Sequence, residues 1–382
     1  MKNLLYLSGI LWMTGLGFQP SSDTIRVEKT YSELVFEETR TLPSSSGVKS
    51  VLFNPEGTKL YALNLEGGSI YEFSQSEKKI SREILFQRTK TSGLDYATGH
   101  SIASFAEKPV EACFLNKTLW VSLHNAGGII PIFPDTLALN KDNLKIAYTK
   151  AVVIDLEKQR RDTIGLPLIK TGKTPKVIAA TADRSHLLVS NWSAKTIAIL
   201  KLNDTLAPYG RKIASLKMPA TPRGIATDSK SDRSYVAIMG SNKIMVIHNR
   251  SWKVERTFVV PLNPRHILTA TSDRLFVSFN AGSQIACINA KTGKVLFKAK
   301  TGLQPRTIAL SENQQFLFVT CYKGNTLEVF KINPDHFQKI YTLRCTGKPV
   351  GLAIHENDKQ LEAWVGNYMG GNLKIFTFKK VR

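Results

Sequence analysis

Four cationic residues recur at one position of a repeated turn. In each case a lysine or arginine follows a proline directly: Lys176, Arg223, Arg265 and Arg306. Arginine presents paired N–H donors that match a carboxylate or a phosphate, and cations gathered in a concave site attract anions. If the four turns converge in the fold, these residues form an anion-binding site. The alternative is that each cation pairs with a nearby carboxylate or extends into water.

A second set of polar and aromatic residues is expected at the same rim. It consists of His124, Asn191, Trp192, Tyr322, Asn367, Tyr368 and, directly after Arg265, His266. Aromatic rings beside cations suit a sugar, a nucleobase or another flat anionic ligand. We therefore expect an anionic small molecule, a glycan or a nucleic acid as the ligand. The alternative is that the rings only cover apolar space between structural units.

The sequence carries no motif of a known catalytic centre. It lacks the GxSxG, HExxH, phosphate-loop and CxxCH patterns. Glu107 and Glu111, on either side of Pro109, are the one acidic pair of interest, since glycoside hydrolysis needs two neighbouring carboxylates. We expect no cofactor and no metal, and we favour binding over catalysis. An enzyme remains the alternative, because catalytic residues can come from segments that lie far apart in the sequence.

Seven segments of the chain share one pattern of strands and turns. A turn, usually containing proline, leads to an apolar strand, a polar turn, a second strand, a short loop and a third strand. The second strands end in YALN, WVSL, LVSN, YVAI, FVSF, FVTC and WVGN. The third strands are SIYEF, AVVIDL, TIAIL, KIMVI, QIACI, TLEVF and LKIF. Repeats of about 40 residues built from such strands predict an all-β, seven-bladed propeller.

The two ends of the repeat region predict a closed ring. The last repeat has three strands and no room for a fourth, and a strand-like segment, Glu33–Leu42, precedes the first repeat. We expect this N-terminal strand to complete the last blade, which removes an exposed sheet edge. The residue three positions after each turn proline, such as Ile178, Ile225 or Ile308, is expected to pack between blades.

Two long insertions are predicted on one face of the ring, called the top. Residues 89–107 lengthen the crossover into the second blade, and residues 126–150 lengthen a loop within it. Long loops in a compact domain commonly form lids or binding loops. The alternative is neutral insertion, since length costs little loop entropy.

The N-terminus resembles a secretory signal peptide. Lys2 is followed by the mainly apolar stretch from Leu4 to Phe18, which is short for a membrane span. We assign residues 1–19 to the signal peptide and 20–382 to one propeller domain. No cysteine follows the apolar run, so we expect a periplasmic or secreted monomer without a lipid or transmembrane anchor.

Charge and cysteine content are consistent with an exported basic protein. The 52 Lys and Arg residues exceed the 30 Asp and Glu residues, giving a net charge of +22. Such a charge favours acidic partners, although the basic residues are dispersed along the chain. The four cysteines, Cys113, Cys287, Cys321 and Cys345, have no metal-site spacing. We expect buried thiols, with a Cys287–Cys321 disulfide as the alternative.

The strand endings LVSN, FVTC, YVAI and WVGN, each followed after a short loop by a strand such as AVVIDL, resemble the YVTN-repeat family of bacterial seven-bladed propellers, which includes YncE-like proteins. The resemblance covers roughly residues 34–377. Its repeats are degenerate, and the turn typical of the family survives best at Asn54-Pro55-Glu56-Gly57. The resemblance implies a propeller, export and often a binding role, but no particular substrate.

These observations lead to one hypothesis and two alternatives. The hypothesis is an exported propeller that binds an anion in a basic funnel on its top face. The first alternative is a propeller enzyme, such as a lactonase or a quinone-linked oxidoreductase subunit. The second is a scaffold for an exported protein partner, which a large apolar patch on the side of the ring would favour.

Overall fold

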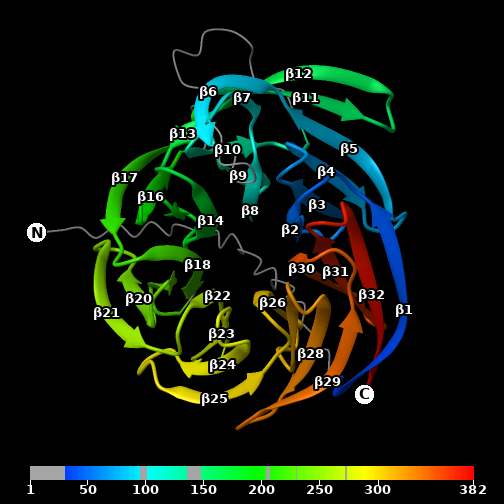
Figure 1. Ribbon diagram of the computed structural model, residues 1–382, viewed down its shortest axis with the longest axis vertical. Coiled ribbons are helices and arrows are strands. Elements are labelled where there is room, and N and C mark those ends of the chain that lie inside the picture. Colours follow the sequence, from blue (N-terminus) through cyan, green and yellow to red (C-terminus); the bar gives the residue numbers. More distant parts are fainter. Residues whose placement is uncertain (1–30, 95–100, 136–147, 204–206, 229, 272) are drawn as a thin grey trace, which may run out of the picture.

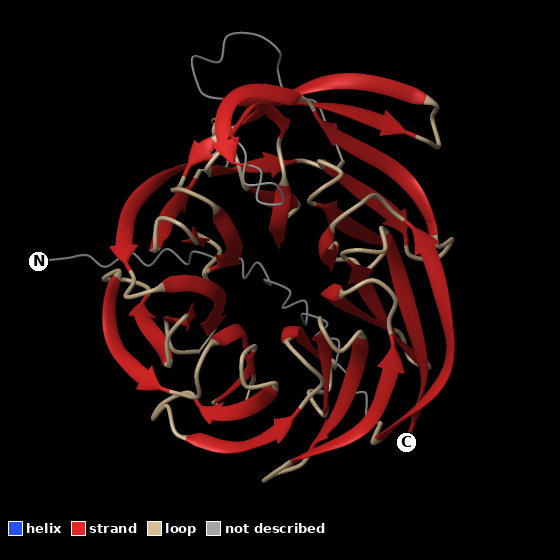
Figure 2. Ribbon diagram, viewed as in Figure 1, coloured by secondary structure: helices blue, strands red, loops and turns tan. Residues whose placement is uncertain are grey.

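All regular elements of the described residues are β-strands, and most of them form a ring of seven antiparallel sheets around a central axis (Figures 1 and 2). The computed structural model describes residues 31–94, 101–135, 148–203, 207–228, 230–271 and 273–382. Within these ranges no helix of membrane-spanning length is found. The predicted signal peptide, residues 1–19, lies outside the described residues. The fold prediction of a seven-bladed propeller is confirmed.

Each sheet is one blade, and its strands follow one another from the axis to the outside. Blade one contains, from the innermost strand outward, β2 (Val48–Phe53), β3 (Lys59–Asn64), β4 (Ser69–Ser74) and β5 (Lys79–Phe86). Blade two contains β8 (Pro109–Leu115), β9 (Thr118–Leu123), β10 (Gly128–Ile132) and β13 (Ile169–Lys170). Blade three contains β14 (Pro175–Ala180), β15 (His186–Asn191), β16 (Thr196–Leu202) and β17 (Gly210–Lys217). Blade four contains β18 (Thr221–Asp228), β19 (Arg233–Met239), β20 (Lys243–His248) and β21 (Lys253–Val259).

The remaining blades follow the same order. Blade five contains β22 (Pro264–Thr269), β23 (Arg274–Phe279), β24 (Gln284–Asn289) and β25 (Val295–Lys300). Blade six contains β26 (Pro305–Leu310), β27 (Phe316–Cys321), β28 (Thr326–Ile332) and β29 (Phe337–Arg344). Blade seven contains β30 (Pro349–Glu356), β31 (Gln360–Asn367), β32 (Asn372–Val381) and β1 (Glu33–Pro43). We call top edge the edge at which each innermost strand begins and the second strand ends, and bottom edge the opposite one.

The N-terminal strand closes the ring as predicted. β1 pairs antiparallel with β32 from Glu33↔Val381 to Pro43↔Asn372, which makes it the fourth strand of blade seven. Leu34 and Leu42 on this strand are buried. Just before β1, the ring of Tyr31 stacks on Phe316 of blade six, and its hydroxyl donates to Glu356. Closure therefore combines main-chain pairing with apolar burial against two blades.

Blade two departs from the prediction. Its third strand is β10, whereas the predicted strand AVVIDL lies in β11 (Tyr148–Asp155), which pairs with β5 of blade one. β11 and β12 (Arg160–Pro167) extend blade one to six strands (Figure 1). Ala151, Val153, Ile164 and Leu166 of this hairpin bury apolar surface together with Ile130 and Ile132 of β10.

The insertions also differ from what we expected. Residues 126–150 are not one loop, because they contain β10 and the start of β11. The true insertion follows β10 at the bottom edge, and its β11–β12 hairpin flanks the outside of blade one. Residues 136–147, in the middle of this insertion, lie outside the described residues. In the crossover 89–107, β6 (Arg88–Leu94) and β7 (Ser101–Ala106) pair as a two-stranded sheet.

A repeated hydroxyl holds the start of the inner strands. These strands begin with a β-bulge, and in four blades a Ser or Thr of the second strand accepts a bond from a bulge amide. The same hydroxyls donate to a main-chain carbonyl of the next blade: Ser122 to Lys176 at 2.7 Å, Ser190 to Arg223 at 3.2 Å, Ser278 to Arg306 at 2.9 Å and Thr320 to Val350 at 3.2 Å. The third position of the YVTN-like pattern thus links neighbouring blades.

Apolar side chains fill the space between blades as predicted. Ile178 packs with Leu115 and Trp120 of blade two, and Ile225 packs with Leu188 of blade three. Ile308 joins a cluster with Phe276 and Ile285 of blade five. Since each sheet has two apolar faces, each blade depends on both neighbours for burial.

We predict that Thr320→Val destabilises the protein by about 1–3 kcal/mol, because it leaves the Thr307 amide and the Val350 carbonyl without their shared partner. Denaturant unfolding measures the change. Thr342→Val, the same substitution at an exposed position of β29, is the control and should have little effect. Equal effects of the two substitutions would contradict a linking role for the hydroxyl.

Candidate functional site

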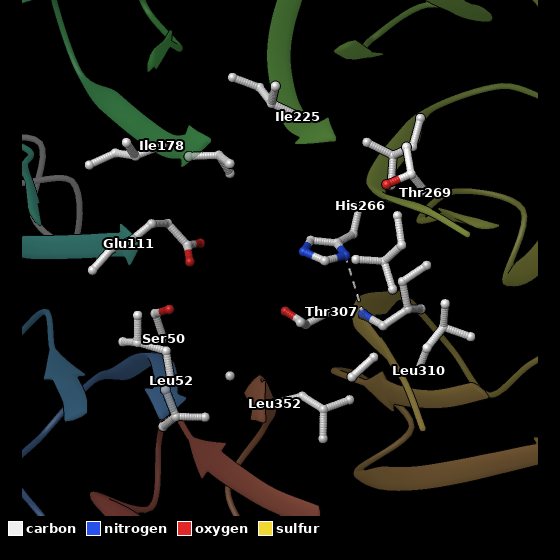
Figure 3. A pocket seen from close by; sticks show the side chains of 18 of the residues that line it. Ser50, Leu52, Glu111, Ile178, Ile225, His266, Thr269, Thr307, Leu310 and Leu352 are labelled. Carbon is white, nitrogen blue, oxygen red and sulfur yellow. Dashed lines mark hydrogen bonds between the residues drawn. The ribbon is translucent and has the colours of Figure 1, made fainter. Parts of the chain in front are cut away.

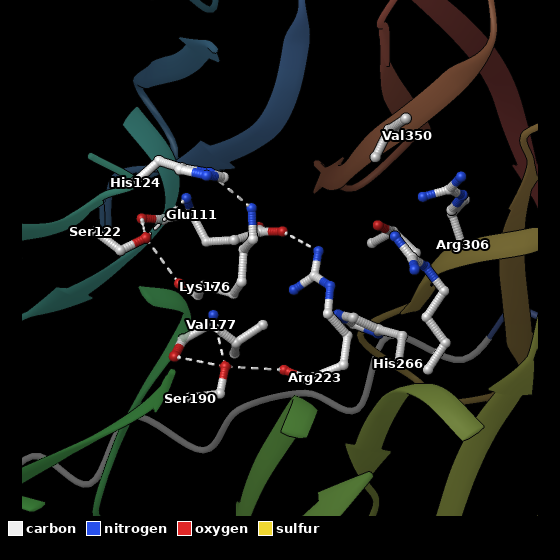
Figure 4. Close-up of polar contacts among 12 residues, drawn as sticks. Glu111, Ser122, His124, Lys176, Val177, Ser190, Arg223, His266, Arg306 and Val350 are labelled. Carbon is white, nitrogen blue, oxygen red and sulfur yellow. Dashed lines mark hydrogen bonds and ion pairs between the residues drawn. The ribbon is translucent and has the colours of Figure 1, made fainter. Parts of the chain in front are cut away.

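Five blades each direct one cation toward the axis just below the top edge. These residues are Lys49, Lys176, Arg223, Arg265 and Arg306, and we call them the cationic ring (Lys176, Arg223 and Arg306 are labelled in Figure 4). Lys176, Arg223 and Arg265 are only 3–6% exposed, and Lys49 and Arg306 are partly buried. The four predicted cations therefore do converge. Burial of so many like charges is unfavourable unless something compensates them.

The sequence prediction does not include Lys49, because blade one has no turn proline. Aligning Gly47 with the turn prolines of the other blades places Val48, and not Lys49, at the cation position. Val48 pairs with Asn64 in the same way that Pro175 pairs with Asn191 and Pro349 with Asn367. Val48, and not Gly47, therefore occupies the position of the turn proline in blade one. The next residue, Lys49, is the equivalent of Lys176. The shared Asn at the end of the second strand is the signal that would have found it.

Among the residues that the structure describes, one carboxylate faces the cationic ring. Glu111, at the start of β8, forms an ion pair of 2.7 Å with Arg223, which reaches it from blade four (Figure 4). Burial alone would raise the pKa of Glu111, but Arg223 and Lys49 outweigh it and hold that pKa below its ordinary value. Glu111 thus stays ionised. The five cations and this one carboxylate leave a large positive excess at the axis.

Burial, together with the neighbouring like charges, lowers the pKa values of Lys49, Lys176, Arg265 and Arg306. Burial, reinforced by Arg223, lowers the pKa of Lys176 to about 7. Burial and the neighbouring arginines Arg223 and Arg265 hold the pKa of Lys49 well below its ordinary value. The pKa of Arg306 falls to about 10 through burial and repulsion by Arg223. In each case the protonated form costs free energy, which a bound anion would recover.

Several donors of the ring have weak partners or none. Arg265 contacts the Met239 sulfur at 3.4 Å, and the guanidinium of Arg306 lies 4.1 Å from the ring centre of Tyr322. Within the described part of the chain, Nη1 of Arg223 and Nε of Arg306 are buried without a hydrogen-bond partner. Unsatisfied buried donors are uncommon in folded proteins and identify a place where a ligand or water can bind.

Below the ring the axis contains a cavity of about 570 Å³ (Figure 3). Glu111, His266, Ser50 and Thr307 supply its polar groups, and inner-strand Ile and Leu residues supply most of the rest. The lining continues to Glu312 and Gln314 in the β26–β27 turn at the bottom edge. A ligand held by the cationic ring therefore has space beneath it along the axis.

The two predicted histidines are neutral donors or acceptors. Burial, followed by Lys176, lowers the pKa of His124 to about 3, and its Nδ1 lies 3.0 Å from Nζ of Lys176. Burial lowers the pKa of His266 to about 4. Nδ1 of His266 accepts a long bond from the Ile308 amide, so its Nε2 is the protonated nitrogen. His266 lines the cavity and His124 lies beside the ring.

The two predicted asparagines serve their own blades. Asn191 accepts a bond from Thr171 and donates to Thr196, and Asn367 donates to Asn372. Both side chains are fully buried. They tie the end of the second strand to the loops of the top edge, as Asn64 does, and therefore do not face the axis. The sequence pattern could not separate these two roles, because a strand end borders both the loop and the rim.

The three predicted aromatic residues remain at the rim. Nζ of Lys176 lies 5.0 Å from the ring centre of Trp192, whose side chain is 38% exposed. Tyr322 stacks with Arg306 of the cationic ring. The hydroxyl of Tyr368 donates to Glu66, which also pairs with Lys108. Trp192 and Tyr322 thus border the cationic ring, whereas Tyr368 belongs to a polar contact between blades one, two and seven.

Other chemistry finds little support at the axis. Within the described ranges no group of three His, Cys, Asp or Glu side chains could hold a metal ion. Glu107 is buried and accepts a bond from the Ala126 amide, so it is separated in role from Glu111. All four cysteines are free thiols, with Cys287 and Cys321 in one apolar cluster.

Two curated relatives share parts of the sequence, while no family model matches it. The antigen Lp49 of Leptospira interrogans serogroup Icterohaemorrhagiae is 26% identical over 226 residues, which are 54% of this chain and 48% of Lp49. The uncharacterised protein YncE of Salmonella typhimurium is 20% identical over 185 residues, 48% of this chain and 49% of YncE. The chain thus spans about half the length of the curated relatives it matches.

Solved structures share the fold over nearly the whole chain. Virginiamycin B lyase from Staphylococcus aureus has a TM-score of 0.61 at 15% identity, covering 90% of this chain and 99% of the lyase chain. A chain of the Kuenenia stuttgartiensis hydrazine synthase has a TM-score of 0.62 at 12% identity, covering 88% and 96%. At such identities the likeness concerns the fold alone. The chain is thus a seven-bladed β-propeller, closed by an N-terminal strand, that is similar to YncE and Lp49 over about half of its length.

Proposed function

We propose that this propeller binds an anionic ligand at the cationic ring. The observation that carries the proposal is the convergence of five cations from five blades on a single carboxylate, Glu111. A structural role would not require this excess, because one ion pair satisfies the carboxylate. The vacant N–H groups of Arg223 and Arg306 offer directional donors in addition to charge.

The arrangement favours a compact anion over a long polyanion. The ring residues are largely buried and lie close to the axis, so a linear polymer could present only one end or one turn to them. A carboxylate or phosphate group fits the guanidinium donors, and the cavity below can hold the rest of a small molecule. Trp192 and Tyr322 add ring faces at the rim.

Binding of a compact anion should depend on the ring. We expect Arg265→Met to weaken binding of inorganic phosphate or citrate about tenfold or more, because a hydrogen bond to a charged group is lost. Isothermal titration calorimetry on the full chain measures the affinities. Arg211→Met removes the same charge from an exposed position of β17 and should leave them unchanged. If neither phosphate, citrate nor a nucleoside monophosphate binds the unmodified protein at millimolar concentration, the proposal is wrong.

Glu111 should oppose the anion. Glu111→Gln removes the carboxylate that pairs with Arg223, so we expect lower stability without an anion and tighter phosphate binding. Thermal unfolding with and without phosphate measures both effects. Glu255→Gln, at an exposed pair with Arg233 and Arg256, is the matched control. A phosphate-induced rise in Tm that is smaller in Glu111→Gln than in the unmodified chain would contradict this arrangement.

Lys176 should make stability depend on pH. Its folded pKa of about 7 is below the ordinary 10.5, so between these values the unfolded chain binds more protons and stability rises with pH. Arg223, Arg265, Lys108, Glu111 and His124 are the charged or titratable groups that face it. Relative to Lys176→Met, we expect a gain of up to about 1 kcal/mol per pH unit from pH 7 to 8.5.

Denaturant unfolding of both chains at each pH measures this difference. A saturating anion should flatten it, because the anion keeps Lys176 protonated in the folded state. Parallel pH profiles for the two chains would show that the pKa of Lys176 is not lowered in the folded state.

A further inference from the structure

Charge is divided unequally between the two edges of blades three to seven. The structure describes every loop and crossover at the top edge of these blades, and none of them contains Asp or Glu. Their exposed cations are Lys173, Lys195, Lys217, Lys300, Lys323 and Arg344. The bottom-edge turns of the same blades carry Asp183, Asp228, Asp232, Asp273, Glu312, Asp335, Glu356 and Asp358. The dispersed basic residues of the sequence therefore leave one face uniformly positive.

The pairing register places several of these cations in one row. Thr196 pairs with Lys217, Gln284 pairs with Lys300, and Thr326 pairs with Arg344, each at the start of a third strand. Each cation is the last residue of an outermost strand. The outer rim of the top edge is therefore charged, while the cationic ring lies at its centre.

The most exposed apolar side chains lie on the same face. Among the described large apolar residues, those at 60–71% exposure are Val259, Leu262, Leu303 and Met369. Val259 ends β21, Leu262 lies in the crossover that follows it, Leu303 lies in the next crossover, and Met369 lies in the β31–β32 loop. Trp192, in the β15–β16 loop, continues this arc. We call these five residues the apolar tips.

We propose that the top edge of blades three to seven docks on an anionic lipid surface, with the apolar tips in the headgroup region and the surrounding cations against the lipid charges. Isolated Leu, Met and Trp side chains at the tips of separate loops cannot form one protein-binding groove, but a deformable surface contacts them all. The cations among these side chains are attracted to the negative charges of an anionic bilayer. A nucleic acid would use the cations but has no use for Leu262, Leu303 or Met369.

The docking surface is distinct from the cationic ring. The ring residues are buried or partly buried, whereas the tips and rim cations are exposed, so the two sites share no cation and meet only at Trp192, which lies beside Lys176. The inference therefore does not rest on the proposed anion site. It is consistent with an exported chain but uses no property of the signal peptide.

Co-sedimentation of the full chain with large unilamellar vesicles tests the proposal. We expect binding to vesicles containing phosphatidylglycerol, little binding to pure phosphatidylcholine, and release by high salt. Leu303→Ser with Met369→Ser should lower the partition coefficient about tenfold or more, and Lys300→Gln with Lys323→Gln should do the same. Insertion of Trp192 should shift its fluorescence to the blue, and Trp192→Phe should abolish that shift.

Matched variants separate the surface from general stickiness. Leu296→Ser with Lys298→Gln removes an exposed leucine and a lysine from the outer strand β25 and should bind like the unmodified chain. Arg265→Met should also bind normally, which distinguishes this surface from the cationic ring. Absence of binding to phosphatidylglycerol vesicles at low salt, or equal losses in the β25 control, would overturn the proposal. So would binding of single-stranded DNA with the same dependence on the rim lysines and none on the apolar tips.

Discussion

The structure depends on closure of the ring, because no blade buries both of its faces alone. Ile178, Ile225 and Ile308 each require side chains from the preceding blade. The β1–β32 pairing supplies the last outer strand and joins the two ends of the chain. Hydroxyls such as Ser190 and Ser278 add directional links from one blade to the carbonyls of the next. Closure thus fixes the distance of every inner strand from the axis.

That geometry explains how the cationic ring forms. The bulge at the start of each inner strand directs the next side chain to the axis, and the inter-blade hydroxyls fix the carbonyls of Lys176, Arg223 and Arg306. Like charges are then held together by main-chain geometry and not by attraction. The depressed pKa of Lys176 expresses this cost. Binding of an anion would lower the free-energy cost of keeping these cations protonated, which supports the proposed function.

The top and bottom edges of the propeller differ in how their charged residues are paired. The bottom edge uses its acidic residues locally, as when Asp183 accepts bonds from Thr181 and Ser185 within its own turn. The top edge lacks such acids in blades three to seven and keeps its lysines unneutralised. The two proposals, anion binding at the axis and docking on an anionic surface, rest on the same distribution of charge at two different depths.

The repeated strand pattern by itself determined the seven blades, the closing strand Glu33–Leu42 and four of the five ring cations, because these depend on local alternation and a constant period. The tertiary structure decided what depends on partners distant in sequence. AVVIDL joined blade one because β5 offered a free edge, and Glu111 met Arg223 across the axis. The place of Lys49 in the cationic ring followed from strand register, and the role of Asn191 in the top-edge loops followed from the side of the strand end on which its side chain lies. These outcomes depend on the energies of packing and strand pairing between distant segments. The spacing of residues in the sequence carries no information about those energies.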